Sequence, residues 1–259
     1  MKKVPGSLLG LFLGIFAIFG AFVLEGGTFK ALFLVPPLII VFGGTFAAVI
    51  IGFGLEKFVQ IFYLMRMAYF PPMYNLTDLI NNFVDFSIIT RRQGFLALEK
   101  ELYRLDYLYP RKLIGYVLDG TDAENLQTIA VMEIKAMQER HYTNISMFAK
   151  MGGYAPTMGI IGTVMGLIMT LANAGSDPNS LIHNIATAFI ATLWGVFSAN
   201  IIWFPIGDKL KKCHQEEKKM MELSLEGILA LQSGEIPSVL KARLVSHLPQ
   251  KEQLRILAS

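Results

Sequence analysis

The chain has 259 residues, of which 53% are hydrophobic and only 17% charged, and its mean hydropathy is +0.48. These values are far more apolar than those of a soluble domain and indicate a membrane protein. The formal net charge of +3 is small and dispersed, which argues against a nucleic-acid-binding protein. The single cysteine, Cys213, excludes an internal disulfide.

Four stretches contain no Asp, Glu, Lys or Arg and are long enough to cross a bilayer, whose hydrocarbon core of ~30 Å needs about 20 helical residues. They are residues 4–24, 31–55, 151–176 and 178–207. The first follows two lysines, as a signal peptide does. However, no clear cleavage site follows it and Glu25 leads into the second stretch, so we interpret it as a retained span.

The positions of the basic residues predict that both termini are cytoplasmic. Lys2 and Lys3 precede the first span and Lys209 follows the fourth, whereas the connectors near Lys30 and Asp177 carry at most one basic residue. Basic residues in short flanking segments stay on the cytoplasmic side.

This pattern divides the chain into four parts. We expect residues 1–55 to form spans one and two, and residues 151–207 to form spans three and four. Residues 56–150 should form a cytoplasmic helical domain, and residues 208–259 cytoplasmic C-terminal helices.

The cytoplasmic segment has the apolar spacing of helices over residues 76–86 and 95–105. Thr121 and Glu124 have the form of a capping box that begins another helix. No helix breaker follows before Gly152, so this helix is expected to run over about 122–175, directly into the third span.

Helix is also predicted to continue from the fourth span to Gly234, and Pro237 and Pro249 then begin two short terminal pieces. The expected fold class is therefore an all-α membrane protein. It has four transmembrane helices and a large helical cytoplasmic domain, with long helices that continue from spans three and four into the cytoplasm.

Small residues in the third and fourth spans recur at a spacing that lets helix backbones approach closely. They include Gly159, Gly162 and Gly166 in the third span and Gly195 in the fourth. Packing alone is the simpler interpretation for these glycines. The functional interpretation is that close packing brings polar side chains to a shared surface.

Hydroxyl groups are the candidates for lining an ion path. Thr163 and Thr170 lie seven residues apart, on one face of the third span, and Thr192 and Ser198 belong to the fourth. A membrane threonine usually bonds its own backbone. Packing and lining therefore both stay open for Thr163 and Thr192, and a structural role is favoured for the others. Neither span contains a carboxylate, so the titratable group is expected from another chain.

Two prolines lie near the cytoplasmic ends of these spans, Pro156 and Pro205. A proline inside a helix removes a hydrogen bond and clashes with the preceding turn. The result is either a static kink that neighbouring helices tolerate or a hinge that transmits a change at the ion path. The pair Pro36-Pro37 is expected only to begin the second span.

These features together resemble the A subunit of the flagellar motor stator, the MotA family within the MotA/TolQ/ExbB group. The resemblance covers essentially the whole chain and its four-span layout. It depends on the third span, on residues 191–200 (ATLWGVFSAN), on Pro205 before residues 207–211, on residues 91–99 (RRQGFLALE) and on residues 139–141.

The resemblance implies a ring of five copies in the bacterial inner membrane around two copies of a B subunit. Each B chain supplies one membrane helix with the ion-carrying aspartate, and a peptidoglycan anchor. Ion flow would turn the ring against the rotor switch protein and drive flagellar rotation. Membrane lipid surrounds such a ring. No cofactor is expected; Na⁺ or H⁺ is only the transported ion. A bound metal, an enzymatic activity and a nucleic-acid partner are not expected either.

The resemblance also assigns roles to individual residues. Pro156 and Pro205 match prolines that couple ion passage to torque, and Arg91 and Glu99 match the rotor-contact charges, with Arg92 as a support. On a continuous helix Arg92 and Glu99 would share a face and Arg91 would be turned roughly 80° away. A solvated helix flank is the simpler interpretation of all three.

Sodium-type relatives carry threonine at the position of Thr163, where many proton-type relatives have alanine. A hydroxyl oxygen can replace part of the hydration shell of a sodium ion, so the resemblance favours sodium over a proton.

Three alternatives compete with the stator interpretation. An energiser of the outer membrane, of the ExbB or TolQ type, is expected to have three spans rather than four. A non-conducting membrane scaffold needs no polar path. An enzyme is disfavoured because the four histidines are scattered without metal-ligand spacing or a nucleophile–base pair.

Overall fold

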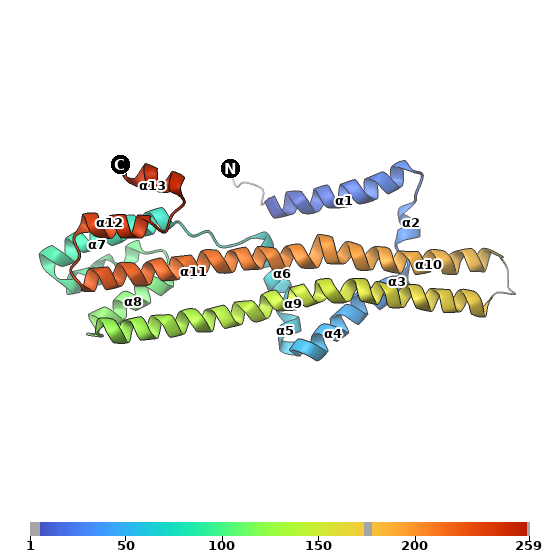
Figure 1. Cartoon of the computed structure of the whole chain (residues 1–259), viewed down its shortest axis with the longest axis horizontal. Coiled ribbons are helices and arrows are strands. Elements are labelled where there is room, and N and C mark those ends of the chain that lie inside the picture. The colour runs from blue at the N-terminus through green and yellow to red at the C-terminus, as the bar shows by residue number, and fades with distance from the viewer. Residues whose placement is uncertain (1–5, 174–177, 258–259) are drawn as a thin grey trace. The chain divides into compact units, whose positions relative to one another are not determined.

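The structure is a computed structural model that describes residues 6–173 and 178–257 (Figure 1). The predicted orientation depends in part on Lys2, Lys3 and Asp177, which lie outside the described residues. The chain forms two compact units. The membrane unit comprises residues 1–72 and 141–213, and the second unit, which we name the cytoplasmic unit after its predicted location, comprises residues 73–140 and 214–259. The predicted division at residues 55, 150 and 207 stays a prediction about the membrane boundary.

Four helices of the described chain are long and apolar enough to cross a membrane, and this part contains no strand, in agreement with the predicted fold class. The first is α1 (Gly6–Leu24), on which Phe19 is buried and most other large side chains are exposed. The second runs from Val35 to Phe53. The third and fourth belong to the long helices α9 (Ala123–Ala172) and α10 (Pro178–Phe197).

The second span consists of several consecutive pieces. These are α3 (Val35–Leu38), a π-helical segment η1 (Ile39–Gly43) and α4 (Gly44–Phe53), and a separate short helix α2 (Phe29–Leu32) precedes them. The predicted continuous span over 31–55 is therefore too long at its start, because the chain is extended at Leu34. Pro36 and Pro37 lie in the first turn of α3, as predicted.

Two further helices complete this half of the membrane unit, α5 (Leu55–Val59) and α6 (Ile61–Tyr69). They pack with α4 in a core that includes Val49, Ile61, Leu64, Phe148 and Trp203. This core joins residues that lie far apart in the sequence.

The fourth span continues without interruption into a second long helix. A π-helical segment η3 (Ser198–Trp203) follows α10 and leads into α11 (Phe204–Gln232). The predictions that α9 runs directly into the third span and that helix continues from the fourth span almost to Gly234 are confirmed. Both long helices contribute residues to each of the two units.

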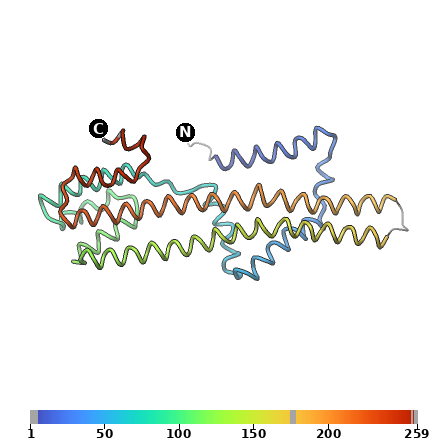
Figure 2. Tube along the Cα trace, in the orientation of Figure 1, coloured from blue at the N-terminus to red at the C-terminus, as the bar shows by residue number. Residues whose placement is uncertain are grey.

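The cytoplasmic unit packs shorter helices on the remaining parts of α9 and α11. These are α7 (Leu76–Gln93), a 3₁₀ helix η2 (Phe95–Arg104), α8 (Leu108–Leu118), α12 (Pro237–Val245) and α13 (Gln250–Leu257). Although far apart in sequence, α7 and α12 lie side by side (Figure 2). The core between these helices includes Phe83, Phe86, Leu126, Leu223 and Leu240.

Two local predictions in this unit are wrong. Residues 95–104 form a 3₁₀ helix instead of an α-helix, and Gly94, whose φ is +79°, ends α7 directly before it. The N-cap of α9 is Asp122 rather than Thr121: its carboxylate accepts a 2.9 Å hydrogen bond from the backbone N–H of Asn125. The hydrogen bonds from Asn125 hold the pKa of Asp122 below its usual value.

Candidate functional site

The backbones of α9 and α10 come into close contact at the predicted glycines. A Cβ atom on Gly159 would lie 2.9 Å from the carbonyl oxygen of Ala191, and one on Gly195 would lie 2.7 Å from the carbonyl oxygen of Ala155. Backbone atoms cannot move aside as a flexible side chain can. These two positions therefore require glycine for the observed helix separation.

The other two glycines face alanines instead. A Cβ atom on Gly162 would lie 2.6 Å from Cβ of Ala191, and one on Gly166 would lie 2.8 Å from Cβ of Ala188. The contact thus extends over at least two turns of each helix. All four glycines serve close approach, and none of them presents a chemical group of its own.

This close contact brings Thr163 and Thr192 together. Their hydroxyl oxygens lie 2.5 Å apart, and the carbonyl oxygens of Ala188 and Gly159 lie 3.0 and 3.1 Å from Oγ1 of Thr163. Thr163 has one hydroxyl proton, so it can donate to only one of these acceptors at a time. Three oxygen atoms therefore surround one half-buried hydroxyl in a region without acidic or basic side chains.

The remaining two hydroxyls of the predicted path lie apart from this cluster. The Thr170 hydroxyl donates to the carbonyl of Gly166 at 2.9 Å, within its own helix. That of Ser198 donates to the carbonyl of Gly195 at 3.2 Å and is fully buried. Both make the local backbone bond that a threonine or serine in a membrane helix commonly makes.

The two prolines occupy different local structures. Pro156 lies inside α9, and its Cα atom is among the nearest to a Cβ placed on Gly195, at 3.2 Å. Pro205 is the second residue of α11 and directly follows the π-helical segment η3. A π-helical turn shifts the hydrogen-bond register by one residue, so it can take up the bond that proline removes. Both prolines thus lie within a turn or two of the helix contact.

The predicted rotor-contact charges lie on the cytoplasmic unit. Arg91, Arg92 and Glu99 are all exposed, and Arg91 donates a 3.3 Å hydrogen bond to the carbonyl of Gly234. Because α7 ends at Gln93, the argument from a continuous helix, which put Arg92 and Glu99 on one face, is wrong. The side chain of Leu96, between these charges, is 74% exposed.

Trp194 has a structural role that its sequence does not reveal. The indole N–H donates a 2.8 Å hydrogen bond to the carbonyl of Leu32, at the end of α2 where no helical bond satisfies that carbonyl. Its ring also packs on Phe19, Phe33 and Phe197. It therefore holds α2, which precedes the second span, against the fourth span. The apolar neighbours of Trp194 in sequence hint at burial, but nothing in the sequence indicates its partner.

Comparisons with known proteins all point to the same family. Residues 99–223 match the MotA/TolQ/ExbB proton channel family. The chain is 33% identical to Motility protein A of Bacillus subtilis (strain 168), over 96% of this chain and 92% of the relative. It is 35% identical to Motility protein A of Treponema pallidum (strain Nichols), over 95% and 94% of the two chains.

A solved structure has the same fold. The structure of the flagellar MotAB stator complex from Bacillus subtilis matches with a TM-score of 0.88 and 34% identity, over 96% of this chain and 97% of that chain. Agreement over nearly the full length includes both N-terminal spans.

Proposed function

The chain belongs to the MotA/TolQ/ExbB proton channel family, and we propose that it is the A-type subunit of a flagellar motor stator, which uses a cation gradient to turn the rotor. Its four apolar helices and its family make it a multi-pass protein of the inner membrane. We propose further that both termini are cytoplasmic, as the basic residues around the first and fourth spans suggest.

One observation carries the proposal. Residues 151–176 and 178–207 pack glycine against backbone and gather hydroxyl and carbonyl oxygens, yet contain no acidic residue. An isolated charge inside a bilayer costs at least a few kcal/mol, so an ion path here needs an ionisable group from outside this chain. A single membrane helix with one aspartate, supplied by a B-type partner, would meet that need.

A solved relative supports the proposed partner, and the family resemblance suggests the assembly. The solved relative is a MotAB complex, so we propose a B-type subunit as the partner of this chain, with five copies of the chain in a ring around it. The rotor switch protein would contact Arg91 and Glu99, and Arg92 would support that contact. Exposed charges of this kind steer encounter and set register more than they add affinity.

Sodium is the ion we propose. The hydroxyls of Thr163 and Thr192, with the Ala188 carbonyl, offer oxygen ligands at one depth of the helix contact. Such oxygens can replace part of the hydration shell of a sodium ion, whereas a proton needs no such shell. Thr170 and Ser198 would line the path only at its margins, because their hydroxyls already bond their own helices.

The test is conduction with and without the partner. The chain should be purified alone and with its B subunit, reconstituted into vesicles, and assayed for sodium and proton flux. Flux is expected only with the B subunit present and should disappear when the membrane aspartate of that subunit is replaced by Asn. Flux through the chain alone would contradict the proposal.

An outer-membrane energiser and a non-conducting scaffold are the two rival functions. The presence of both N-terminal spans, and the likeness to motility proteins over nearly the whole chain, favour the stator over an energiser of the outer membrane. A non-conducting scaffold would tolerate Thr163→Ala and Pro156→Ala in a motility assay as long as the ring still assembles. For a stator we expect both substitutions to slow swimming at unchanged ring content.

A further inference from the structure

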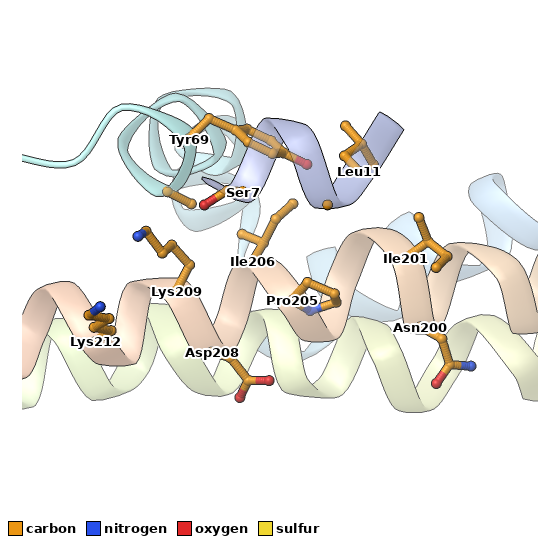
Figure 3. Close-up of a pocket in the computed structure, with 12 residues that line it drawn as sticks. Ser7, Leu11, Tyr69, Asn200, Ile201, Pro205, Ile206, Asp208, Lys209 and Lys212 are labelled. Carbon is orange, nitrogen blue, oxygen red and sulfur yellow. The ribbon is translucent and has the colours of Figure 1, made fainter. Parts of the chain in front are cut away.

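A cavity of about 510 Å³ lies within the membrane unit, between α1, the end of α6 and the junction of η3 with α11 (Figure 3). Ser7, Lys209 and Lys212 lie at one end of it, and Leu11 and Ile201 lie at the other (Figure 3). The cavity is therefore amphipathic along its length. Its charged end falls where the uncharged fourth span stops, at Asp208.

The charged end favours an anion. Lys209 points from α11 toward α1, whereas Asp208, which also lines the cavity, is exposed and its carboxylate points away from α1 (Figure 3). Lys209 is half-buried, and it has no ion-pair partner among residues 6–173 and 178–257. Lys212 adds a second positive charge to the lining. A half-buried ammonium group beside an apolar wall is stabilised when an anion enters.

Two hydroxyls beside the lysines add neutral hydrogen-bond donors. Ser7 of α1 and Tyr69 of α6 both line the cavity, and neither hydroxyl bonds another of the described residues. Phosphate and ester oxygens are acceptors only, so two such donors in the same cavity as the lysines suit a phosphate group that carries esters.

The apolar end leads toward a second cavity. This cavity, of about 900 Å³, lies between α1 and α10 and is lined mainly by apolar side chains, including Phe16, Phe19 and Trp194. From Lys209 back to Trp194 the helix rises about 22 Å. One leaflet contributes about 15 Å of hydrocarbon, so the two cavities together offer an apolar surface as long as an acyl chain in that leaflet.

We propose that this cavity binds an anionic phospholipid of the cytoplasmic leaflet, with its phosphate at Lys209 and Lys212 and an acyl chain along Leu11 and Ile201. The cytoplasmic leaflet carries anionic lipids, and each lysine near its surface contributes about 1 kcal/mol of attraction. A helix from a second copy of this chain would cover the apolar wall but would leave the ammonium group of Lys209 without an anion. Pro205 also lines the cavity. The coupling role of this proline rests on the proposed function, whereas binding of the lipid does not.

Binding can be measured on the complete A–B complex in detergent micelles, with fluorescent phosphatidylglycerol and phosphatidylcholine as probes. Tighter binding of phosphatidylglycerol is expected. Lys209→Gln should weaken it about fivefold, as the loss of one lysine near an anionic headgroup predicts. Lys211→Gln is the matched control, because Lys211 is exposed and does not line the cavity.

Three results would overturn the site. They are equal binding of the two lipids, equal losses in the Lys209 and Lys211 variants, and displacement of phosphatidylglycerol by inorganic phosphate, which would indicate a site for free anions. These readouts need neither ion flux nor motility, so failure of the lipid site and failure of the stator function can be told apart.

A second variant tests the apolar end without changing charge. Gly10 lines the cavity, and a Cβ atom there would meet no heavy atom within 4 Å. The side chain of Gly10→Leu should fill the space and abolish tight phosphatidylglycerol binding at unchanged ring mass, whereas Gly6→Leu, outside the cavity, should not. A Gly10→Leu complex that keeps its lipid affinity but loses its ring would show that a second copy covers this face, contrary to the proposal.

Discussion

The hydroxyl oxygens of Thr163 and Thr192 lie 2.5 Å apart across the contact of α9 with α10. Thr163 also bonds within its own helix, to Gly159, but no second partner of Thr192 occurs among the described residues. Removal of Thr163 therefore leaves Thr192 with no polar contact in a low-dielectric region, and such a loss costs about 1–3 kcal/mol.

For a sodium path, Thr163→Ala should raise the external sodium concentration that gives half-maximal swimming speed by about fivefold, since one oxygen ligand contributes ~1 kcal/mol. Thr163→Ser, which keeps the oxygen, should retain the wild-type curve. Thr187→Ala is the control, because the exposed Thr187 hydroxyl bonds only the carbonyl of His183. A swimming speed independent of sodium in the wild type would remove the argument for sodium.

The glycine contact predicts that one added methyl group lowers stability at one position of α9 and not at another. Gly159→Ala would place Cβ 2.9 Å from a carbonyl oxygen of α10, and overpacking of this kind costs about 1–3 kcal/mol. Gly153→Ala, on the same helix, meets no heavy atom within 4 Å. The thermal unfolding temperature of the purified complex should fall in the first variant and stay near wild type in the second. Equal temperatures would show that the two helices can separate freely.

The exposed charges of the cytoplasmic unit predict a partner effect. Reversal of Glu99 to Lys should impair swimming, and a matching charge reversal on the rotor switch protein should restore it, because opposite charges set the register of the contact. Lys100→Glu, which reverses an adjacent exposed charge, is the control. Normal motility after reversal of both Arg91 and Glu99 would exclude these residues as the rotor contact.

Leu96 gives a separate test of the same surface. Its side chain is 74% exposed between the charges, and burial of this apolar surface by a partner would favour association. Leu96→Ala should reduce torque without lowering the unfolding temperature. A loss of stability instead would show that Leu96 packs within its own unit.

Glu217 makes the stability of the cytoplasmic unit depend on pH. Burial raises the pKa of its carboxyl, and a hydrogen bond with Tyr74 and the nearby charges of His214 and Arg140 only partly offset this. The folded state therefore holds its proton to a higher pH than the unfolded state does. The contribution of Glu217 to stability is greatest below the unfolded pKa and is lost as pH rises through the folded pKa.

Glu217→Gln should consequently raise the unfolding temperature of the full chain more at pH 8 than at pH 4, since glutamine needs no proton to stay neutral. Glu222→Gln, at an exposed residue paired with Lys218, provides the comparison. A gain that is the same at both pH values would show that the ionisation of Glu217 does not affect folding.

Much of the architecture could be predicted from the sequence because it depends on properties of neighbouring residues. The lack of charge over residues 151–207, apart from Asp177, identifies two spans, and the absence of a helix breaker between Glu124 and Gly152 predicts a helix that enters the membrane. A helix of this kind needs no partner to be recognised. The family resemblance also followed from short motifs, and the relatives confirm it.

Other features could not be predicted because they depend on contacts between distant parts of the chain. The pattern of apolar residues after Gly94 is compatible with both an α-helix and a 3₁₀ helix, and the left-handed backbone of Gly94, which separates Arg92 from the helix of Glu99, leaves no trace in that pattern. The bond of Trp194 to Leu32 joins positions 162 residues apart.

A membrane protein of four helical spans, with no acidic residue in the last two, can be recognised from the amino-acid order alone, since hydropathy and periodicity are sums over adjacent residues. The packed structure alone shows that Thr163 contacts Thr192 while Thr170 and Ser198 bond within their own helices. It also shows that Lys209 faces a cavity closed by α1. These outcomes depend on how two helices are rotated against each other, and that rotation is set by the summed packing of side chains from separate segments.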